Sequence, residues 1–197
     1  MKSMKNIEKA VADFKSGKFL IVLDHKKREN EADLVLAAEK CTPEKVNFMI
    51  THAKGLVCVP MSGKRINELN LHPMTKINTE LHHCRFTVSV DLKKGTTTGI
   101  SAYDRSATIR ALANPKSVSS DFAKPGHIFP LRCGENGLKQ RQGHTEAAIE
   151  LCKIAGLEEC AVICEIIGKN GRMARGKELL DFAKKFKIEM INIKNLA

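Results

Sequence analysis

The sequence is poor in aromatic residues, with no tryptophan, one tyrosine and eight phenylalanines among its 197 residues. Proteins that bind single-stranded nucleic acid commonly stack the bases on aromatic side chains, and no basic motif with interleaved aromatics is present. We therefore predict no nucleic-acid partner. The formal net charge of +11 at pH 7 leaves a basic RNA-binding module open as an alternative, although the same charge would attract a small phosphorylated substrate.

Long hydrophobic runs are also missing. No uninterrupted apolar stretch approaches the roughly 20 residues that span a bilayer, and residues 1–8 lack the apolar segment of a secretory signal. The composition, with 43% hydrophobic and 28% charged residues, is ordinary for a soluble globular protein. These features predict a cytoplasmic protein with no membrane partner.

The chain contains no Cys-x-x-Cys pair, and its seven cysteines form an odd, scattered set. This pattern fits neither a disulfide framework nor a zinc ribbon and predicts a reducing compartment. His72, His82, His83 and Cys84 are close together in the sequence, which raises the alternative of a zinc site. Because their spacing fits no familiar zinc motif, we expect a polar loop there.

Hydrophobic periodicity predicts one domain, residues 1–197, that mixes helices and strands. No internal repeat or low-complexity linker divides it. Apolar residues at helical spacing predict helices, and short apolar or alternating runs predict strands. The expected helices cover residues 7–14, 43–54, 62–71, 101–113, 147–155 and 176–186. The expected strands cover residues 19–23, 34–38, 56–59, 86–90, 161–167 and 188–193, with an extended connection over 114–126 and a short apolar segment over 126–131.

The segment from Asp24 to Asp33 is rich in charged side chains. It presents four carboxylates and Arg28 between two apolar runs that we expect to be buried strands, so the core would hold the segment at both ends. Carboxylates in defined positions suit a hard cation such as magnesium, and an arginine beside them suits a planar anionic group. The alternative is a solvated hairpin loop with scattered charges.

A helix start at Arg141–Glu146 is the second candidate site. Arginine, glycine, histidine and threonine converge there on the positive end of a helix, where a phosphate is favoured. The neutral imidazole of His144 could also bind a metal. The alternative is that His144 is only a capping or surface residue.

Glu165 interrupts the most apolar stretch, residues 161–167. Burying a glutamate in a strand costs free energy unless the side chain is paired, binds a ligand or lies at the end of the strand that borders a functional site. Burial favours its neutral form, which suits a group that transfers protons.

Seven short sequence motifs, taken in their order along the chain, resemble those of 3,4-dihydroxy-2-butanone 4-phosphate synthase. The resemblance covers about residues 7–190. The motifs are Arg28–Leu34, Phe86–Asp91, Thr97–Ser101, Asp104–Arg105, Gly126–Pro130, Gly143–Glu146 and Cys164–Glu165. The resemblance implies a lyase of riboflavin biosynthesis that converts D-ribulose 5-phosphate to 3,4-dihydroxy-2-butanone 4-phosphate and formate with Mg2+ or Mn2+. It also implies an α+β fold, a three-layer sandwich around a mixed β-sheet, and a homodimer with sites near the subunit interface.

The same resemblance implies roles for individual residues. Glu29 and His144 would hold the metal, and Glu165 would be the proton-transfer carboxylate. His127 would be an essential histidine that could reach across the dimer interface. The substrate-binding residues would be Arg28, Glu29, Asp33, Arg141, Gln142, Gly143, His144, Thr145 and Glu165, with Arg141, Gly143 and Thr145 near the phosphate. Asp24, Glu31, Cys58 and Thr98 would line the site.

Three positions depart from the family pattern. Ala32 replaces a usual glycine, His25 a common acidic residue, and Gln142 a frequent second arginine. Alanine restricts the backbone more than glycine, so the acidic segment could be set differently. The family's frequent partner, a GTP cyclohydrolase II domain, is absent from these residues, so we expect a monofunctional enzyme. A metal-dependent enzyme acting on another sugar phosphate remains a third hypothesis.

Overall fold

A computed structural model describes residues 2–26 and 28–196 of the chain. Lys27 of the acidic segment therefore lies outside the described residues. The helices are α1 (Lys2–Lys15), α2 (Pro43–Phe48), α3 (Gly63–Glu68), α4 (Ala102–Ala113), α5 (His144–Ala155) and α6 (Gly176–Phe186). The strands are β1 (Leu20–Leu23), β2 (Ala32–Ala37), β3 (Cys58–Met61), β4 (Val90–Leu92), β5 (Phe122–Arg132), β6 (Ala161–Glu165) and β7 (Glu189–Asn192).

The strands form one seven-stranded mixed sheet in the order β4-β5-β3-β6-β2-β1-β7. The pairs β1–β7 and β3–β5 are parallel, and the remaining neighbours are antiparallel. The central strands β6 and β2 come from opposite ends of the chain. The sheet therefore brings the acidic segment next to the end of the apolar stretch that contains Glu165.

Alternate side chains of the central strands enter two separate cores. On β2, Leu34 and Leu36 pack on one face of the sheet, and Val35 and Ala37 pack on the other. Strands covered on both faces contain continuous apolar runs, which is why the sequence of β1, β2 and β6 lacks a clear apolar–polar alternation. Each polar residue in these strands consequently faces one of the two helical layers.

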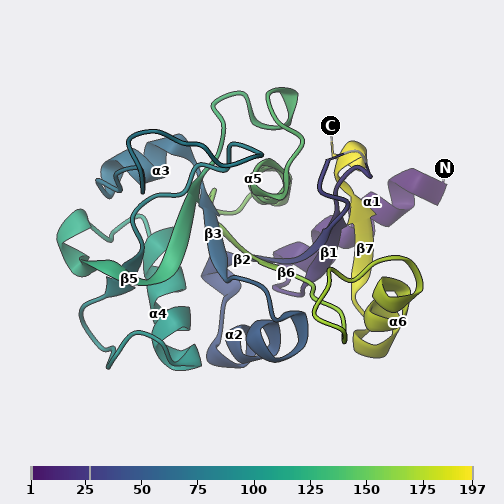
Figure 1. Cartoon of the computed structure of the whole chain (residues 1–197), viewed down its shortest axis with the longest axis horizontal. Coiled ribbons are helices and arrows are strands. Elements are labelled where there is room, and N and C mark those ends of the chain that lie inside the picture. Colours follow the sequence, from purple (N-terminus) through teal and green to yellow (C-terminus); the bar gives the residue numbers. More distant parts are fainter. Residues whose placement is uncertain (1, 27, 197) are drawn as a thin grey trace.

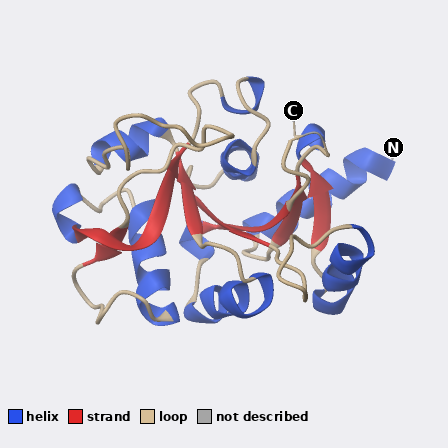
Figure 2. Ribbon diagram, viewed as in Figure 1, coloured by secondary structure: helices blue, strands red, loops and turns tan. Residues whose placement is uncertain are grey.

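Helices cover both faces of the sheet (Figure 1). Helices α2, α4 and α6 lie below the sheet in this view, and α5 lies above it, where it also contacts α1. The strands form the middle layer between them (Figure 2). The expected three-layer α+β sandwich around a mixed sheet is confirmed.

Several element boundaries differ from the sequence prediction. Strand β2 begins at Ala32, so Asp33 belongs to the sheet and not to the loop. Strand β5 covers eleven residues, where we expected the end of an extended connection followed by a short apolar segment. The alternating run 86–90 is mainly irregular, with single bridges at Phe86 and Thr87, because β4 pairs with β5 only from Val90 onward. The helix after Pro43 changes to a π-helix over Met49–Ala53.

In the described part of the chain, no helix is long and apolar enough to cross a membrane. All seven cysteines are free thiols. His72, His82, His83 and Cys84 do not belong to any metal-binding group found among residues 2–26 and 28–196. Residues 71–85 lie outside the helices and strands, with an isolated bridge at Pro73, so the segment is irregular as expected.

Candidate active site

Asp24 organises the acidic loop. Its carboxylate, which is buried, accepts hydrogen bonds from the backbone N–H of Glu29 at 3.0 Å and of Glu31 at 2.9 Å. The same carboxylate lies 3.2 Å from Nη1 of Arg28, which also contacts Glu29 at 2.5 Å. These contacts brace the described part of the turn after β1 and give the carboxylate of Glu29 a defined position.

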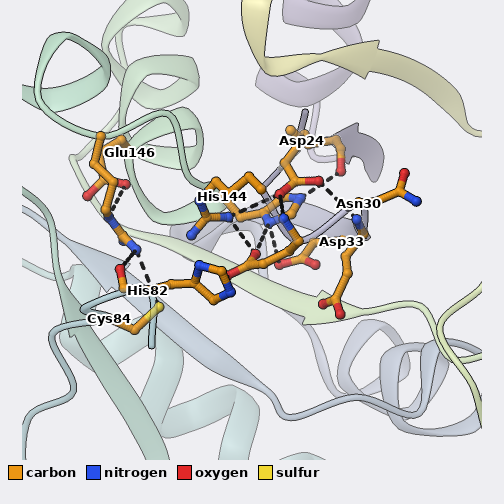
Figure 3. Close-up of polar contacts among 12 residues, drawn as sticks. Asp24, Asn30, Asp33, His82, Cys84, His144 and Glu146 are labelled. Carbon is orange, nitrogen blue, oxygen red and sulfur yellow. Dashed lines mark hydrogen bonds and ion pairs between the residues drawn. The ribbon is translucent and has the colours of Figure 1, made fainter. Parts of the chain in front are cut away.

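His144, the first residue of α5, points into this loop (Figure 3). Its Nε2 lies 3.1 Å from the backbone carbonyl oxygen of Val22. A carbonyl oxygen can only accept, so Nε2 carries the proton. In the neutral ring the free lone pair is therefore on Nδ1, which lies 3.6 Å from Glu29 and 3.9 Å from Asp33.

Asp24, Glu29 and His144 form a candidate metal site. Each offers one ligand atom, and these atoms lie within 4.8 Å of one another. Two carboxylate oxygens and one imidazole nitrogen suit a divalent cation such as Mg2+ or Mn2+. The carbonyl of Val22 orients the imidazole in the way that outer partners commonly orient metal-bound histidines. The donor set therefore fits the metal that the sequence predicts, with Asp24 added to the predicted pair.

Burial and close opposite charges shift the pKa values of the cluster. Burial raises the pKa of Glu29, but His144 and Arg28 outweigh it and lower the value to about 2. Burial lowers the pKa of His144, but Asp33 and Glu29 outweigh it and raise the value to about 9. Burial dominates at Asp33 and raises its pKa to about 7. The protonated imidazole and the guanidinium of Arg28 thus both provide positive charge among these carboxylates.

Asp33 and Glu165 are opposite each other on the paired strands β2 and β6. Both side chains face the α5 layer, because they alternate with Leu34 and Cys164, which pack in the other core. Asp33 is 2% exposed, and its Oδ1 has no hydrogen-bond partner among the described residues. A buried carboxylate oxygen without a partner is costly, so this oxygen is available for a ligand.

Glu165 is held from the other side by the chain before β3. The backbone N–H of Leu56 donates to Oε2 of Glu165 at 2.8 Å. A Cβ atom at Gly55 would lie 2.4 Å from the same oxygen, so this close approach requires glycine. Cys58, the first residue of β3, is buried, and its pKa is raised mainly by burial and also by the carboxylates of Glu165 and Asp33.

The N-terminus of α5 forms a compact basic corner. Gly143 is the N-cap residue and provides no side-chain cap. A Cβ atom there would lie 3.0 Å from Oε2 of Glu146, 3.1 Å from Nη2 of Arg28 and 3.3 Å from Cζ of Arg141. Two guanidinium groups and the positive end of a helix therefore converge on one glycine, which is favourable for a phosphate.

Arg141 is fixed from two directions. Its Nε lies 3.0 Å from Oε2 of buried Glu146, and its Nη1 lies 3.3 Å from Sγ of Cys84 and 3.4 Å from the carbonyl oxygen of His82. Figure 3 shows Glu146, His82 and Cys84 together on one side of the acidic loop. Thr145 is buried in the first turn of α5, whereas the side chain of Gln142 is exposed.

His127 is not part of this cluster in the described chain. Its Nδ1 lies 2.6 Å from Oδ2 of Asp91, and its backbone N–H donates to Oδ1 of Asp91 at 2.9 Å.

The structure thus brings most of the predicted residues together and separates a few. The residues around the acidic loop and the start of α5 are Asp24, Arg28, Glu29, Asp33, Arg141, Gly143, His144, Thr145 and Glu165. Glu31 lies in the same loop, where burial, Glu29 and Glu165 raise its pKa. Thr98 is exposed in the loop before α4 and borders Gly99, where a Cβ atom would lie 2.7 Å from Nδ1 of His127.

Three residues were not assigned a role from the sequence. Asp91 pairs with His127, Glu146 pairs with Arg141, and Arg175 donates to the backbone of the acidic loop at Asn30. Asp91 and Glu146 are the last residues of two of the seven motifs, and this position could have identified them from the sequence. Arg175 is 145 residues from Asn30 in the sequence, and no local pattern indicates that contact.

Comparison with known proteins gives consistent findings. The family model of 3,4-dihydroxy-2-butanone 4-phosphate synthase matches residues 8–197. The riboflavin biosynthesis protein RibBA of Bacillus mycoides (strain KBAB4) is 54% identical over 190 residues, covering 96% of this chain and 48% of that protein. RibBA of Endomicrobium trichonymphae is 52% identical over 195 residues, covering 99% and 48%. The chain spans about half the length of these curated relatives.

Solved structures are similar over nearly the whole chain. A 3,4-dihydroxy-2-butanone 4-phosphate synthase in complex with two magnesium ions has a TM-score of 0.92 and 42% identity, covering 96% of this chain and 94% of that one. The synthase of Candida albicans has a TM-score of 0.89 and 49% identity, with the same coverages. The two-domain synthase RibBX of A. baumannii has a TM-score of 0.92 and 44% identity, covering 96% of this chain and 56% of that one.

Proposed function

The chain belongs to the 3,4-dihydroxy-2-butanone 4-phosphate synthase family, and on this premise we propose that it converts D-ribulose 5-phosphate to 3,4-dihydroxy-2-butanone 4-phosphate and formate in riboflavin biosynthesis. The observation that carries the proposal is the grouping of Asp24, Glu29 and His144 beside the paired carboxylates Asp33 and Glu165. Formate loss from a ketose phosphate requires a divalent metal and groups that move protons in both directions.

In this proposal Glu29 and His144 hold Mg2+ or Mn2+, and Asp24 adds an oxygen or braces the loop. Bound there, the cation would stabilise the negative charge of enediolates formed from the sugar. The neutral imidazole that the carbonyl of Val22 orients offers Nδ1 as the ligand atom. Magnesium usually keeps water and substrate oxygens among its ligands, so a small number of protein donors is sufficient.

The phosphate of the substrate binds at the start of α5. Arg141 and the backbone of Gly143 and Thr145 contact it, and Arg28 completes the positive surroundings. Glu146 keeps the guanidinium of Arg141 in place, and the uncapped helix N-terminus attracts the anion. Binding of the phosphate at this place orients the flexible sugar so that its reacting carbons face the carboxylates.

Glu165 and Asp33 transfer the protons. The pKa of Asp33, raised to about 7 by burial, allows this carboxyl to be neutral or charged near physiological pH. Glu165 is oriented by the N–H of Leu56. Two neighbouring carboxyl groups in different surroundings can act as acid and base in turn, as successive enolisation and dehydration require.

The active form is proposed to be a homodimer in the cytoplasm. The ring of His127 is 43% exposed and does not contact the acidic cluster of its own chain, which supports a role in the site of a partner subunit. Two large apolar side chains beside His127 and Glu165 are exposed: Leu56, whose N–H donates to Glu165, and Ile100, which follows Gly99 next to the ring of His127. Exposed apolar residues beside a site are typical of a surface that another subunit covers.

Formate release from ribulose 5-phosphate tests this function directly. We expect formate from the wild-type protein with Mg2+, none with EDTA, and a loss of at least about a hundredfold in kcat for Glu165→Gln and His144→Ala, the scale of general acid–base catalysis. Asp181→Asn, at an exposed position on α6, is the matched control.

The possible outcomes test the reaction, the site residues and the substrate separately. Metal-dependent formate that both site variants retain would keep the reaction and overturn the assigned site. Absence of formate with every divalent metal would overturn the reaction. Turnover of another sugar phosphate in a substrate panel would leave the metal site and change the substrate.

A further inference from the structure

We propose that Arg175 is a positioning residue that sets the metal affinity of the site by holding the backbone of Glu29. This inference rests on the proposed function, in which Glu29 is a metal ligand. Arg175 is the N-cap residue of α6. Its Nε donates to the carbonyl oxygen of Asn30 at 2.9 Å, and its Nη2 donates to the carbonyl oxygen of Glu29 at 3.3 Å.

These contacts complete the support of Glu29. Its N–H is held by the carboxylate of Asp24 at 3.0 Å, and its carbonyl oxygen is held by Arg175. Both peptide groups beside the Cα atom of Glu29 are therefore fixed, which limits the positions that its carboxylate can reach. Asn30 follows with a φ of 55°, a left-handed conformation that asparagine adopts more readily than most residues.

The turn that carries Arg175 is itself firmly built. The backbone N–H of Ala174 donates to the carbonyl oxygen of Ile166 at 2.9 Å, one residue after Glu165. Lys54 donates to the carbonyl oxygen of Gly168 at 2.8 Å, and Glu178 accepts from the N–H of Lys169 at 2.8 Å. The turn therefore connects the strand end of the proton-transfer glutamate to the loop of the metal ligand.

An arginine suits this task because its planar group offers several donors in a fixed arrangement and can reach two successive carbonyl oxygens. Outer partners of metal ligands typically change metal affinity by 10–100-fold when they are removed. Since the hydrogen bonds of Arg175 to the described part of the loop go to backbone carbonyl oxygens, its effect should appear in metal binding, with little change in substrate binding once metal is saturating.

Direct titration with Mn2+ in the absence of substrate tests the inference. We expect the Kd for Mn2+ to rise about tenfold in Arg175→Ala and to rise less in Arg175→Lys, which keeps one donor group. Arg172→Ala, which removes an exposed arginine from the same turn, should bind Mn2+ like the wild type. With saturating Mg2+, Arg175→Ala should recover its kcat, and its KM for ribulose 5-phosphate should stay within about twofold of the wild-type value.

An Mn2+ affinity in folded Arg175→Ala or Arg175→Lys equal to that of Arg172→Ala would overturn the inference, as would failure of the wild type to bind Mn2+. Should Arg175→Ala not fold, the lysine variant decides. Absence of formate from all proteins, with the Mn2+ affinities still differing as expected, would overturn the proposed reaction and support the positioning role.

Discussion

His144 shows how one hydrogen bond decides the chemistry of a side chain. The sequence identified it as a possible metal ligand but could not say which nitrogen was available. The carbonyl oxygen of Val22, 122 residues away in the chain, lies 3.1 Å from Nε2 and directs Nδ1 toward the acidic loop. The other neutral tautomer, with the proton on Nδ1, would place the Nε2 lone pair against the carbonyl oxygen and would leave no lone pair on Nδ1 to bind a cation.

Asp91 is expected to orient His127 in the same way. Its carboxylate contacts both the ring and the backbone N–H of the histidine. Asparagine keeps the shape but replaces one accepting oxygen with a donor, so one contact is lost or the ring changes tautomer. We expect Asp91→Asn to lower kcat by about a hundredfold, at the low end of the range that acid–base catalysis contributes.

The measurement combines formate release with ¹⁵N chemical shifts of the His127 ring, which report the tautomer. Asp181→Asn again provides the control. A wild-type kcat together with a changed ring tautomer would show that the orientation of His127 does not matter for the reaction.

At the scale of elements, helix α5 connects the proposed phosphate site at its N-terminus to the acidic loop that carries Asp24 and Glu29. Its first residue is His144, its N-cap is Gly143, and its body is buried against the sheet. Because the helix is rigid, the imidazole and the anion-binding N-terminus keep a constant separation. The antiparallel register of β2 and β6 acts similarly for Asp33 and Glu165.

The end of α5 offers a stability test away from the site. Gly156 has a φ of 66°, and its N–H donates to the carbonyl oxygen of Lys153 at 3.1 Å. A β-carbon is strained in this left-handed conformation, so Gly156→Ala should cost about 1 kcal/mol. For a domain of this size that lowers Tm by about 2–4 °C.

Thermal unfolding followed by circular dichroism measures this change, and formate release should stay at the wild-type rate. Gly156→Asn is the matched control, since asparagine tolerates the left-handed region and should lose less stability. Equal Tm values for the alanine and asparagine variants would contradict the capping role.

At the scale of the whole molecule, the position of His127 makes the site dependent on a second chain in the proposed homodimer. Mixing His127→Ala with Glu165→Gln subunits tests this arrangement. Random pairing yields half heterodimers, and each heterodimer has one site with both residues intact. About one quarter of the wild-type activity should therefore return, as expected for symmetric pairing of two sites.

Formate release before and after joint refolding of the two inactive variants provides the measurement. Each variant refolded alone is the control. If no activity returns although heterodimers form, His127 serves its own chain or has no role in the reaction.

Local patterns in the sequence already determined much of this protein. Apolar runs predicted the central strands β1, β2 and β6, because strands buried on both faces need continuous apolar residues. The Pro43 helix start and the charged segment between β1 and β2 also agreed with expectation. Residue types at motif spacing identified the family and the candidate ligands Glu29 and His144, because their chemistry is visible without coordinates.

Only the tertiary structure decided how these residues meet. The strand order places Asp33 beside Glu165, adds Asp24 to the metal group, connects Arg175 to the acidic loop and leaves His127 with Asp91. These contacts join segments that are up to 146 residues apart. Their distances depend on sheet order and helix packing, which are cooperative properties of the whole core, and no spacing along the chain encodes them separately.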